Sequence, residues 1–324
     1  MKHAIFTAAI AACVAAPLGA ATLADTYTSY FAFGDSLTDD GKFFPFTTAP
    51  SFEGRFSNGE TYAEIIAGDF AVSGNYALGG ATAGPVNLNA PYTNPALNAY
   101  ATLGDQVTTF IASGDAGSAG ANPLVSILMG SNDIFQNAFD PLFDVTDTVD
   151  HLIDAIYAIA GLGPFDDFVV PLTPGATGPS PFAPLRQDFN AYFLSRLAGL
   201  EADGINIIVP DFDAASARIA ADPLAFGITT IGACAPTFFG PDDAENCTFT
   251  GYDEFGNPQY DLSLADAYTL ADPVHPSATV HAEWANEFSA AVLSDIAAPV
   301  PLPGTGLLLL GGIAALGMRR RKAA

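Results

Sequence analysis

Three stretches of the sequence are continuous apolar runs rather than alternations of apolar and polar residues. They read "LVSILMG" from Leu124, "FVV" from Phe168 and "INIIVP" from Ile205. Strands covered on both faces have this composition, because every side chain of such a strand lies in a core. Covered strands belong to parallel sheets with helices on both sides. The runs therefore predict an α/β fold, a three-layer α/β/α sandwich around a central parallel sheet.

About five strands are expected, alternating with helices. The candidate strands are Tyr30–Gly34, Phe70–Val72, Leu124–Gly130, Phe168–Pro171 and Ile205–Pro210. The candidate helices are Thr61–Ala67, Leu103–Ala112, Val149–Ile159, Leu185–Ala202 and Thr279–Leu293. Segments rich in Pro, Gly, Asn and Asp are predicted to be loops: Asn87–Pro95, Pro171–Pro184 and Gly232–Asp261. Loops of that length are usually functional, so we expect them around the entrance of a site.

The N-terminal residues 1–24 differ from the body of the chain. They begin with Lys2 and His3, continue with an apolar stretch and end in small residues, "GAATLA". This order is typical of a secretory signal peptide, and we predict cleavage after Ala24, with Ala20 as the alternative. A short membrane anchor and lipidation at Cys13 are the other interpretations. The apolar run is short for both, since a span needs about 20 residues.

Residues 297–324 form a Pro-rich spacer, an apolar stretch from Gly306 to Met318 and a basic block, "RRRK". Basic residues just beyond an apolar helix hold that side in the cytoplasm. With "VPLPGTG", this order resembles the VPLP form of bacterial PEP-CTERM sorting signals, although Gly304 stands where that form usually has Ala. The resemblance implies a short transmembrane helix in transient membrane contact, an exosortase-like processing enzyme, and export to the cell envelope, cell surface or extracellular matrix. A retained C-terminal anchor is the alternative.

The body that remains, residues 25–296, is strongly acidic. It holds all 35 Asp and Glu residues against five basic residues, a formal charge of −30. Such a surface repels phosphate backbones, which excludes nucleic-acid binding. Two cysteines remain in the body, Cys234 and Cys247. In an oxidising compartment they are most simply one disulfide, and without flanking histidines they do not make a zinc site.

Polar residues stand where the expected strands end. Ser36 in "GDSL" follows the first strand, Gly80 in "NYALGGA" the second and Asn132 in "GSND" the third, while "DPVH" holds Asp272 and His275. Ligands bind beyond the carboxyl ends of parallel strands, so these residues are expected to meet. Each also has a structural interpretation: Ser36 at the N-terminus of a helix after the first strand, the glycine and Asp272 in turns, and Asn132 as a helix cap.

Brought together, these residues make an acyl-transfer site. A serine hydroxyl needs a base within hydrogen-bond reach, and His275, oriented by Asp272, supplies one to Ser36. The backbone N–H groups of Ser36 and Gly80 and the side-chain amide of Asn132 would hold the oxyanion. This chemistry requires no metal and no cofactor. No "GxSxG" motif occurs, which argues against an α/β-hydrolase.

The remaining candidates have less specific patterns. His151 lies on a predicted helix far from any strand end, and His281, in the last helix, is interpreted as a helix-surface or packing residue. Several aromatic side chains either line an acyl groove or pack in the core, and we favour the core because most apolar residues serve packing. They are Phe43, Phe44, Phe46, Phe52, Phe238 and Phe239.

The chain resembles the GDSL (SGNH) family of serine esterases and lipases from Phe31 to roughly Phe288. "GDS", the glycine of "NYALGGA", "GSND" and "DPVH" occur in the family's order, with "GRFSNGETYAE", "LGDQV" and "HPS" between and after them. The resemblance implies the flavodoxin-like SGNH-hydrolase fold and catalytic roles for Ser36, Asp272 and His275. The chain departs from the family in "YTLA" before Asp272 and in lacking Asn after the first Pro of "FVVPLTPGATG", which bears on substrate fit.

We therefore predict a secreted serine hydrolase that cleaves carboxylic esters, of the lipase or esterase type, through an acyl-Ser36 intermediate. Its substrate would be a small-molecule or lipid acyl ester. The alternative is a deacylase of acetylated sugars or polysaccharide. A non-catalytic envelope or matrix binding protein is a third, less favoured, hypothesis, because a fold alone does not establish function.

Overall fold

The computed structural model describes residues 22–43, 52–140, 142–176, 180–234, 247, 249–252, 258–260 and 262–297. The predicted signal peptide and the predicted sorting tail lie outside these residues, except for the last three residues of the former and Ala297. In the described part of the chain, no helix combines the length and apolar character needed to cross a membrane.

Five parallel strands form the central sheet in the order β2-β1-β3-β4-β5. They are β1 (Ser29–Gly34), β2 (Ser73–Asn75), β3 (Pro123–Leu128), β4 (Asp167–Val169) and β5 (Asn206–Ile208). Tyr30 of β1 faces Ser73 of β2 on one side and Leu124 of β3 on the other. This is the flavodoxin-like strand order, in which connections leave β1 and β3 toward opposite faces and open a crevice at their carboxyl ends.

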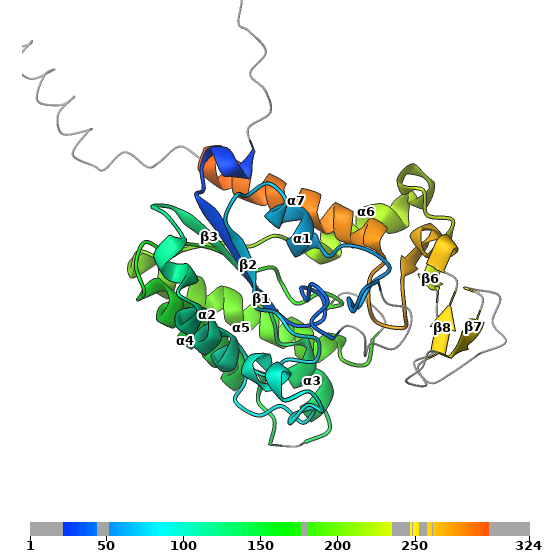
Figure 1. Ribbon diagram of the computed structural model, residues 1–324, viewed down its shortest axis with the longest axis horizontal. Coiled ribbons are helices and arrows are strands. Elements are labelled where there is room, and N and C mark those ends of the chain that lie inside the picture. The colour runs from blue at the N-terminus through cyan, green and yellow to red at the C-terminus, as the bar shows by residue number, and fades with distance from the viewer. Residues whose placement is uncertain are drawn as a thin grey trace, which may run out of the picture.

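Helices cover both faces of the sheet, as Figure 1 shows. The α-helices are α1 (Tyr62–Ala67), α2 (Leu103–Ser113), α3 (Ser131–Asn137), α4 (Val145–Ala160), α5 (Ala183–Ala202), α6 (Phe212–Ala221) and α7 (Ala278–Ala297). Short 3₁₀ segments are η1 (Leu23–Asp25), η2 (Pro95–Tyr100), η3 (Asp115–Ser118), η4 (Pro223–Phe226) and η5 (Leu262–Ala267). The predicted three-layer α/β/α fold is confirmed.

Successive side chains of β1 enter two different cores. Phe31 and Phe33 pack with apolar residues of α2, α4 and α5, whereas Tyr30 and Ala32 pack with those of α1, α6 and α7. All four side chains are buried. A strand that is apolar at every position is therefore required here, because side chains alternate between the faces of a sheet.

Several predicted elements differ from the structure. The edge strand is Ser73–Asn75 rather than Phe70–Val72, because Phe70 packs its ring on Tyr30 at 5.8 Å while the following polar residues supply the backbone pairing. No helix follows Ser36; the backbone N–H groups of Thr38 and Asp39 donate to the Asp35 carbonyl, at 3.0 Å each, and close a single turn. Helix α6 was not predicted.

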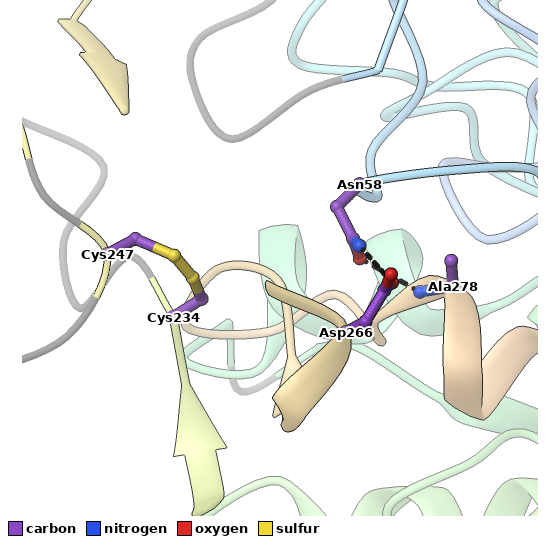
Figure 2. Close-up of a disulfide and its surroundings, with 5 residues drawn as sticks. All are labelled: Asn58, Cys234, Cys247, Asp266 and Ala278. Carbon is purple, nitrogen blue, oxygen red and sulfur yellow. Dashed lines mark hydrogen bonds between the residues drawn. A yellow bond between two sulfur atoms is a disulfide. The ribbon is translucent and has the colours of Figure 1, made fainter. Parts of the chain in front are cut away.

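The segment predicted as a loop over Gly232–Asp261 contains strands. Here β6 (Thr230–Ala233) pairs in parallel with β9 (Tyr268–Leu270), and β7 (Phe249–Tyr252) pairs antiparallel with β8 (Pro258–Tyr260). Figure 2 shows the disulfide that joins Cys234, at the end of β6, to Cys247. The two Cα atoms lie 5.0 Å apart, and both residues are buried against Ala265 and Tyr268.

This bond gives a direct prediction. Titration of free thiols in the denatured, unreduced protein that lacks residues 1–24 should find no reactive thiol, and reduction should release two. A bond across this short loop stabilises the fold by about 3 kcal/mol in the chain-entropy model. Two reactive thiols before reduction would show that Cys234 and Cys247 are unpaired in the protein.

Candidate active site

Ser36, His275 and Asp272 form a chain of hydrogen bonds at the carboxyl edge of the sheet. Ser36 lies two residues beyond β1, and its Oγ is 2.8 Å from Nε2 of His275. The Nδ1 atom of the same ring is 2.6 Å from Oδ2 of Asp272. Since a carboxylate accepts the Nδ1 proton, Nε2 is left to accept the serine hydroxyl proton.

The loop that carries His275 is fixed by its own backbone. The second oxygen of Asp272, Oδ1, accepts the N–H groups of Val274 at 2.9 Å and His275 at 2.8 Å. The carbonyl of His275 accepts the N–H of Ala271 at 2.8 Å. Asp272 therefore stabilises the turn, as its structural interpretation expected, and also orients the imidazole of His275.

The loop is also tied to residues 56–58, far away in sequence. The Phe56 ring packs on the imidazole of His275 at 5.1 Å, and Ser57 Oγ donates to the carbonyl of Pro276 at 2.9 Å. Asn58 donates to Asp266 and accepts the N–H of Ala278 at 2.9 Å, so it caps α7 from a different segment (Figure 2). Residues 56–58 thus hold the His275 loop, and the Phe56 ring packs on the imidazole itself.

The three predicted oxyanion donors line the same pocket as His275. In the described residues, no backbone carbonyl accepts the N–H of Ser36 or of Gly80. Gly80 has φ +80°, a conformation that favours glycine, and the peptide bearing its N–H is held by Tyr92, whose hydroxyl lies 3.3 Å from the Gly79 carbonyl. The structure brings these donors together with the serine.

Asn132 is not the helix cap that its structural interpretation proposed. Helix α3 begins at Ser131 after Gly130, without a side-chain cap, so Asn132 lies inside the first turn. Its Nδ2 donates to the carbonyl of Ala81 at 3.0 Å. An amide nitrogen has two N–H groups, so this bond orients the amide and leaves one N–H for a ligand.

Two buried carboxylates that the sequence analysis did not assign hold the glycine turn. Asp39 accepts the N–H of Gly79 at 2.7 Å, and Asp133 accepts those of Ala83 and Gly84, both at 2.9 Å. Burial raises the pKa of both carboxyls. They link the segments after β1 and β3 to the turn after β2, so the backbone donor at Gly80 is fixed before a substrate binds. In the sequence, the signal for these two carboxylates was their position in "SLTDD" and "GSND", shortly after the residues of the site.

His281 proves to be a packing residue rather than a surface one. It is fully buried, stacks near Tyr62 and accepts the backbone N–H of Tyr62 on Nδ1 at 3.3 Å. Burial lowers the pKa of His281 to about 3, which keeps the ring neutral. His151 is exposed on α4. Neither belongs to the hydrogen-bonded chain at Ser36.

The pocket beside Ser36 has a volume of about 890 Å³. Its apolar wall includes side chains that the sequence analysis did not single out, among them Phe56, Phe135, Phe182, Ile231 and Trp284. Of the predicted aromatic candidates, Phe43 packs on Phe56 and Tyr92, and Phe52 lies on the surface. Phe44, Phe46, Phe238 and Phe239 lie outside the described residues.

Asp35, directly before the serine, is buried, and burial raises its pKa to about 7. The N–H of Leu37 donates to its Oδ1 at 3.0 Å and opposes that shift. The folded state therefore holds this proton more tightly than the unfolded chain does. The resulting stability is fully present below about pH 4 and is lost as the pH rises to 7.

We expect Asp35→Asn to lose less stability than the wild type between pH 4 and pH 8, since the asparagine does not ionise. Each tenfold change in an acid constant corresponds to about 1.4 kcal/mol, so the difference should reach a few kcal/mol. Urea unfolding at several pH values measures it. Asp154→Asn, at an exposed position of α4, is the control. Parallel curves for Asp35→Asn and the wild type would contradict the prediction.

Taken together, a buried parallel sheet carries a Ser-His-Asp chain at its β1/β3 crevice, and Gly80 and Asn132 line the same pocket, which is the arrangement expected of a serine hydrolase. The sequence model of the GDSL-like lipase/acylhydrolase family matches residues 30–288. The chain belongs to this family, as its motifs predicted.

Individual relatives are more distant. The chain is 31% identical over 150 residues to the phosphatidylcholine-sterol acyltransferase of Aeromonas hydrophila, an alignment that covers 44% of this chain and 43% of that protein. The chain thus spans less than half the length of this curated relative.

Similar solved structures include the acetylxylan esterase Axe2 of Geobacillus stearothermophilus, with 14% identity, coverage of 82% of this chain and 94% of that one, and a TM-score of 0.44. The LAE5 hydrolase from the Lake Arreo metagenome has 12% identity, the same coverage and a TM-score of 0.46. At these values neither structure carries information on the substrate.

Proposed function

We propose that this protein is an exported hydrolase of carboxylic esters that works through an acyl-Ser36 intermediate. The observation that carries the proposal is the hydrogen-bonded chain from Ser36 through His275 to Asp272, with Ser36 and His275 separated by 2.8 Å. A serine beside an oriented imidazole is a nucleophile with a general base in place.

The reaction then follows in two halves. His275 takes the hydroxyl proton as Ser36 attacks the ester carbonyl, and the N–H groups of Ser36, Gly80 and Asn132 bind the oxygen as it gains negative charge. The protonated imidazole, stabilised by Asp272, gives its proton to the departing alcohol. A water molecule, deprotonated by the same imidazole, releases the acid from Ser36.

A lipid or other apolar acyl ester is the substrate class that the pocket supports best. The pocket is lined by apolar side chains from α6, β6 and α7, namely Ile219, Ile231, Val280 and Trp284. An acetyl group would leave most of an 890 Å³ pocket empty. Burial of each additional methylene of an acyl chain contributes about 0.8 kcal/mol.

A panel of 4-nitrophenyl esters from acetate to decanoate, together with acetylated xylan, tests this substrate class. We expect kcat/KM to rise with acyl length. Ile231→Asp, at an exposed position on the pocket wall, should lower activity on the long esters more than on acetate. Leu224→Asp, exposed on η4 and outside the pocket, is its control. Activity confined to acetate and acetylated xylan would instead support the sugar-deacylase alternative.

We also propose that residues 297–324 are a sorting tail that an exosortase-like enzyme removes during export to the cell envelope, surface or matrix. The stretch Gly306–Met318 covers roughly 20 Å as a helix, and the hydrocarbon core is about 30 Å thick, so it fits poorly as a permanent span. Protein isolated from its native host should lack the peptide from Gly306 to Ala324, and intact-mass analysis measures this. Recovery of the "RRRK" end would identify a retained anchor.

A further inference from the structure

Arg186, on α5, is a charged side chain in the wall of the catalytic pocket. It is only 8% exposed, and it lines the pocket together with Ser36. Neither the sequence motifs nor the Ser-His-Asp chemistry assigns it a role. A buried cation is costly unless its hydrogen bonds are made and its charge is paired, so the partners of Arg186 decide whether its burial is compensated.

The guanidinium group has five N–H donors and makes few bonds with them. Its one hydrogen bond to a described residue runs from Nη1 to Ser180 Oγ at 3.5 Å, the limit of such a bond. Nε has no hydrogen-bond partner among the residues that the structure describes. No ion pair joins Arg186 to a carboxylate within the described residues. The described part of the chain therefore makes little use of the donors of this cation.

The surroundings hold the group in place without neutralising it. The guanidinium lies over the Phe135 ring, 5.1 Å from its centroid. On another side is Gly175, which has φ +82°; a Cβ atom there would lie 2.8 Å from Nη1. Phe135, Gly175 and Ser180 line the pocket as well. The Phe135 ring and the backbone of Gly175, which has no side chain, thus leave room for the planar guanidinium between them.

Two carboxylates lie near enough to act through their fields. Asp213 accepts the N–H groups of Gly175 at 2.6 Å and Ala176 at 3.0 Å, and Asp35 accepts that of Leu37. Their charges raise the pKa of Arg186, but burial lowers it by more. The two carboxylates therefore offset only part of the free-energy cost of burying the Arg186 charge.

We propose that Arg186 binds an oxyanion, a phosphate or a carboxylate, carried by the ester substrate. A guanidinium fork binds either group through two parallel N–H···O bonds, and in a desolvated pocket such bonds are strong. The inference rests on the proposed ester hydrolysis and adds the class of ester: one with an anionic group on its alcohol or its acyl side.

Two matched substrate pairs test the proposal and separate the two sources of the anion. Monobutyrin and butyryl glycerophosphate differ by a phosphate on the alcohol side. The 4-nitrophenyl esters of butyric acid and of succinic acid, the latter as its monoester, differ by a carboxylate on the acyl side. For each pair, the measured quantity is the ratio of kcat/KM on the anionic ester to kcat/KM on the neutral ester.

Arg186→Met should lower this ratio at least tenfold in one pair, through KM, and the pair that responds identifies the source. Arg186→Lys keeps the charge but not the fork and should lower it less. Arg196→Met, at a half-buried position further along α5 and outside the pocket, is the matched control and should not change it. A ratio that Arg186→Met leaves unchanged in both pairs would overturn the proposal, and equal losses on neutral and anionic esters would too.

A binding measurement keeps the inference separate from ester hydrolysis. If the wild type hydrolyses none of these esters, the proposed function fails, and the effect of inorganic phosphate on the thermal midpoint then decides the role of Arg186. Phosphate that raises the midpoint of the wild type but not of Arg186→Met would support an oxyanion site. The same response in both proteins would overturn it.

Discussion

Replacement of Ser36 by alanine is expected to reduce kcat on 4-nitrophenyl esters by about 10⁴- to 10⁶-fold, because no other group can form the acyl intermediate. The Ser36 hydroxyl is the expected nucleophile because its oxygen lies 2.8 Å from Nε2 of His275, the expected base. Circular dichroism should show an unchanged fold, since the deletion removes one oxygen atom from a pocket. A fluorophosphonate probe should label the wild type at Ser36 and leave Ser36→Ala unlabelled.

The matched control is Ser118→Ala, an exposed serine of η3 whose loss should leave the rate unchanged. For the base, His275→Ala should have an effect as large as that of Ser36→Ala, because the two side chains act as one unit. His151→Ala, exposed on α4, serves as its control. Full activity of Ser36→Ala, or labelling of another serine, would remove Ser36 from the mechanism. A correctly folded wild type without activity on any ester would favour the non-catalytic hypothesis.

The second large effect is expected at Asn132. Asn132→Ala should lower kcat about 10²- to 10³-fold with little change in KM, because an oxyanion donor acts on the charge that develops in the transition state. Initial-rate kinetics over a range of ester concentrations separates the two constants. The bond from Asn132 Nδ2 to the Ala81 carbonyl holds the amide in position for this role.

Asn137→Ala is the control for Asn132, since that side chain lies on the same helix and donates to the carbonyl of Asp133. It should leave kcat close to the wild-type value. A rise in KM at unchanged kcat in Asn132→Ala would instead make Asn132 a substrate-binding residue.

Much of the fold could be predicted because the strands are buried on both faces. Continuous apolar runs locate β3, β4 and β5 to within a few residues, because a strand covered on both faces needs an apolar side chain at every position. The positions of Ser36, Gly80 and Asn132 at the edge of the sheet follow from the parallel arrangement alone. Asp272 and His275 follow no strand of the central sheet, so their place at this edge was predicted from their chemistry and the family resemblance rather than from strand position.

Other features depend on tertiary contacts that a linear pattern does not record. Helix α6 begins at an Asp211 cap and is rich in alanine, and only Phe212, Ala215 and Ile219 are buried in it. That apolar stripe is too sparse to stand out. Arg186 looks in the sequence like an ordinary polar residue of a helix, because its burial is created by Phe135 and Gly175, which come from distant segments.

The two reacting side chains come from opposite ends of the folded body, 239 positions apart. Ser36 follows the first strand of the chain, and His275 directly precedes the last helix, which packs against α1 and α6. A chain still growing on the ribosome, or one that ends before His275, has no base beside its serine. Hydrolytic competence therefore arises only at the end of folding, when the C-terminal segment closes onto the first strand, and the unfinished protein is inactive toward esters around it.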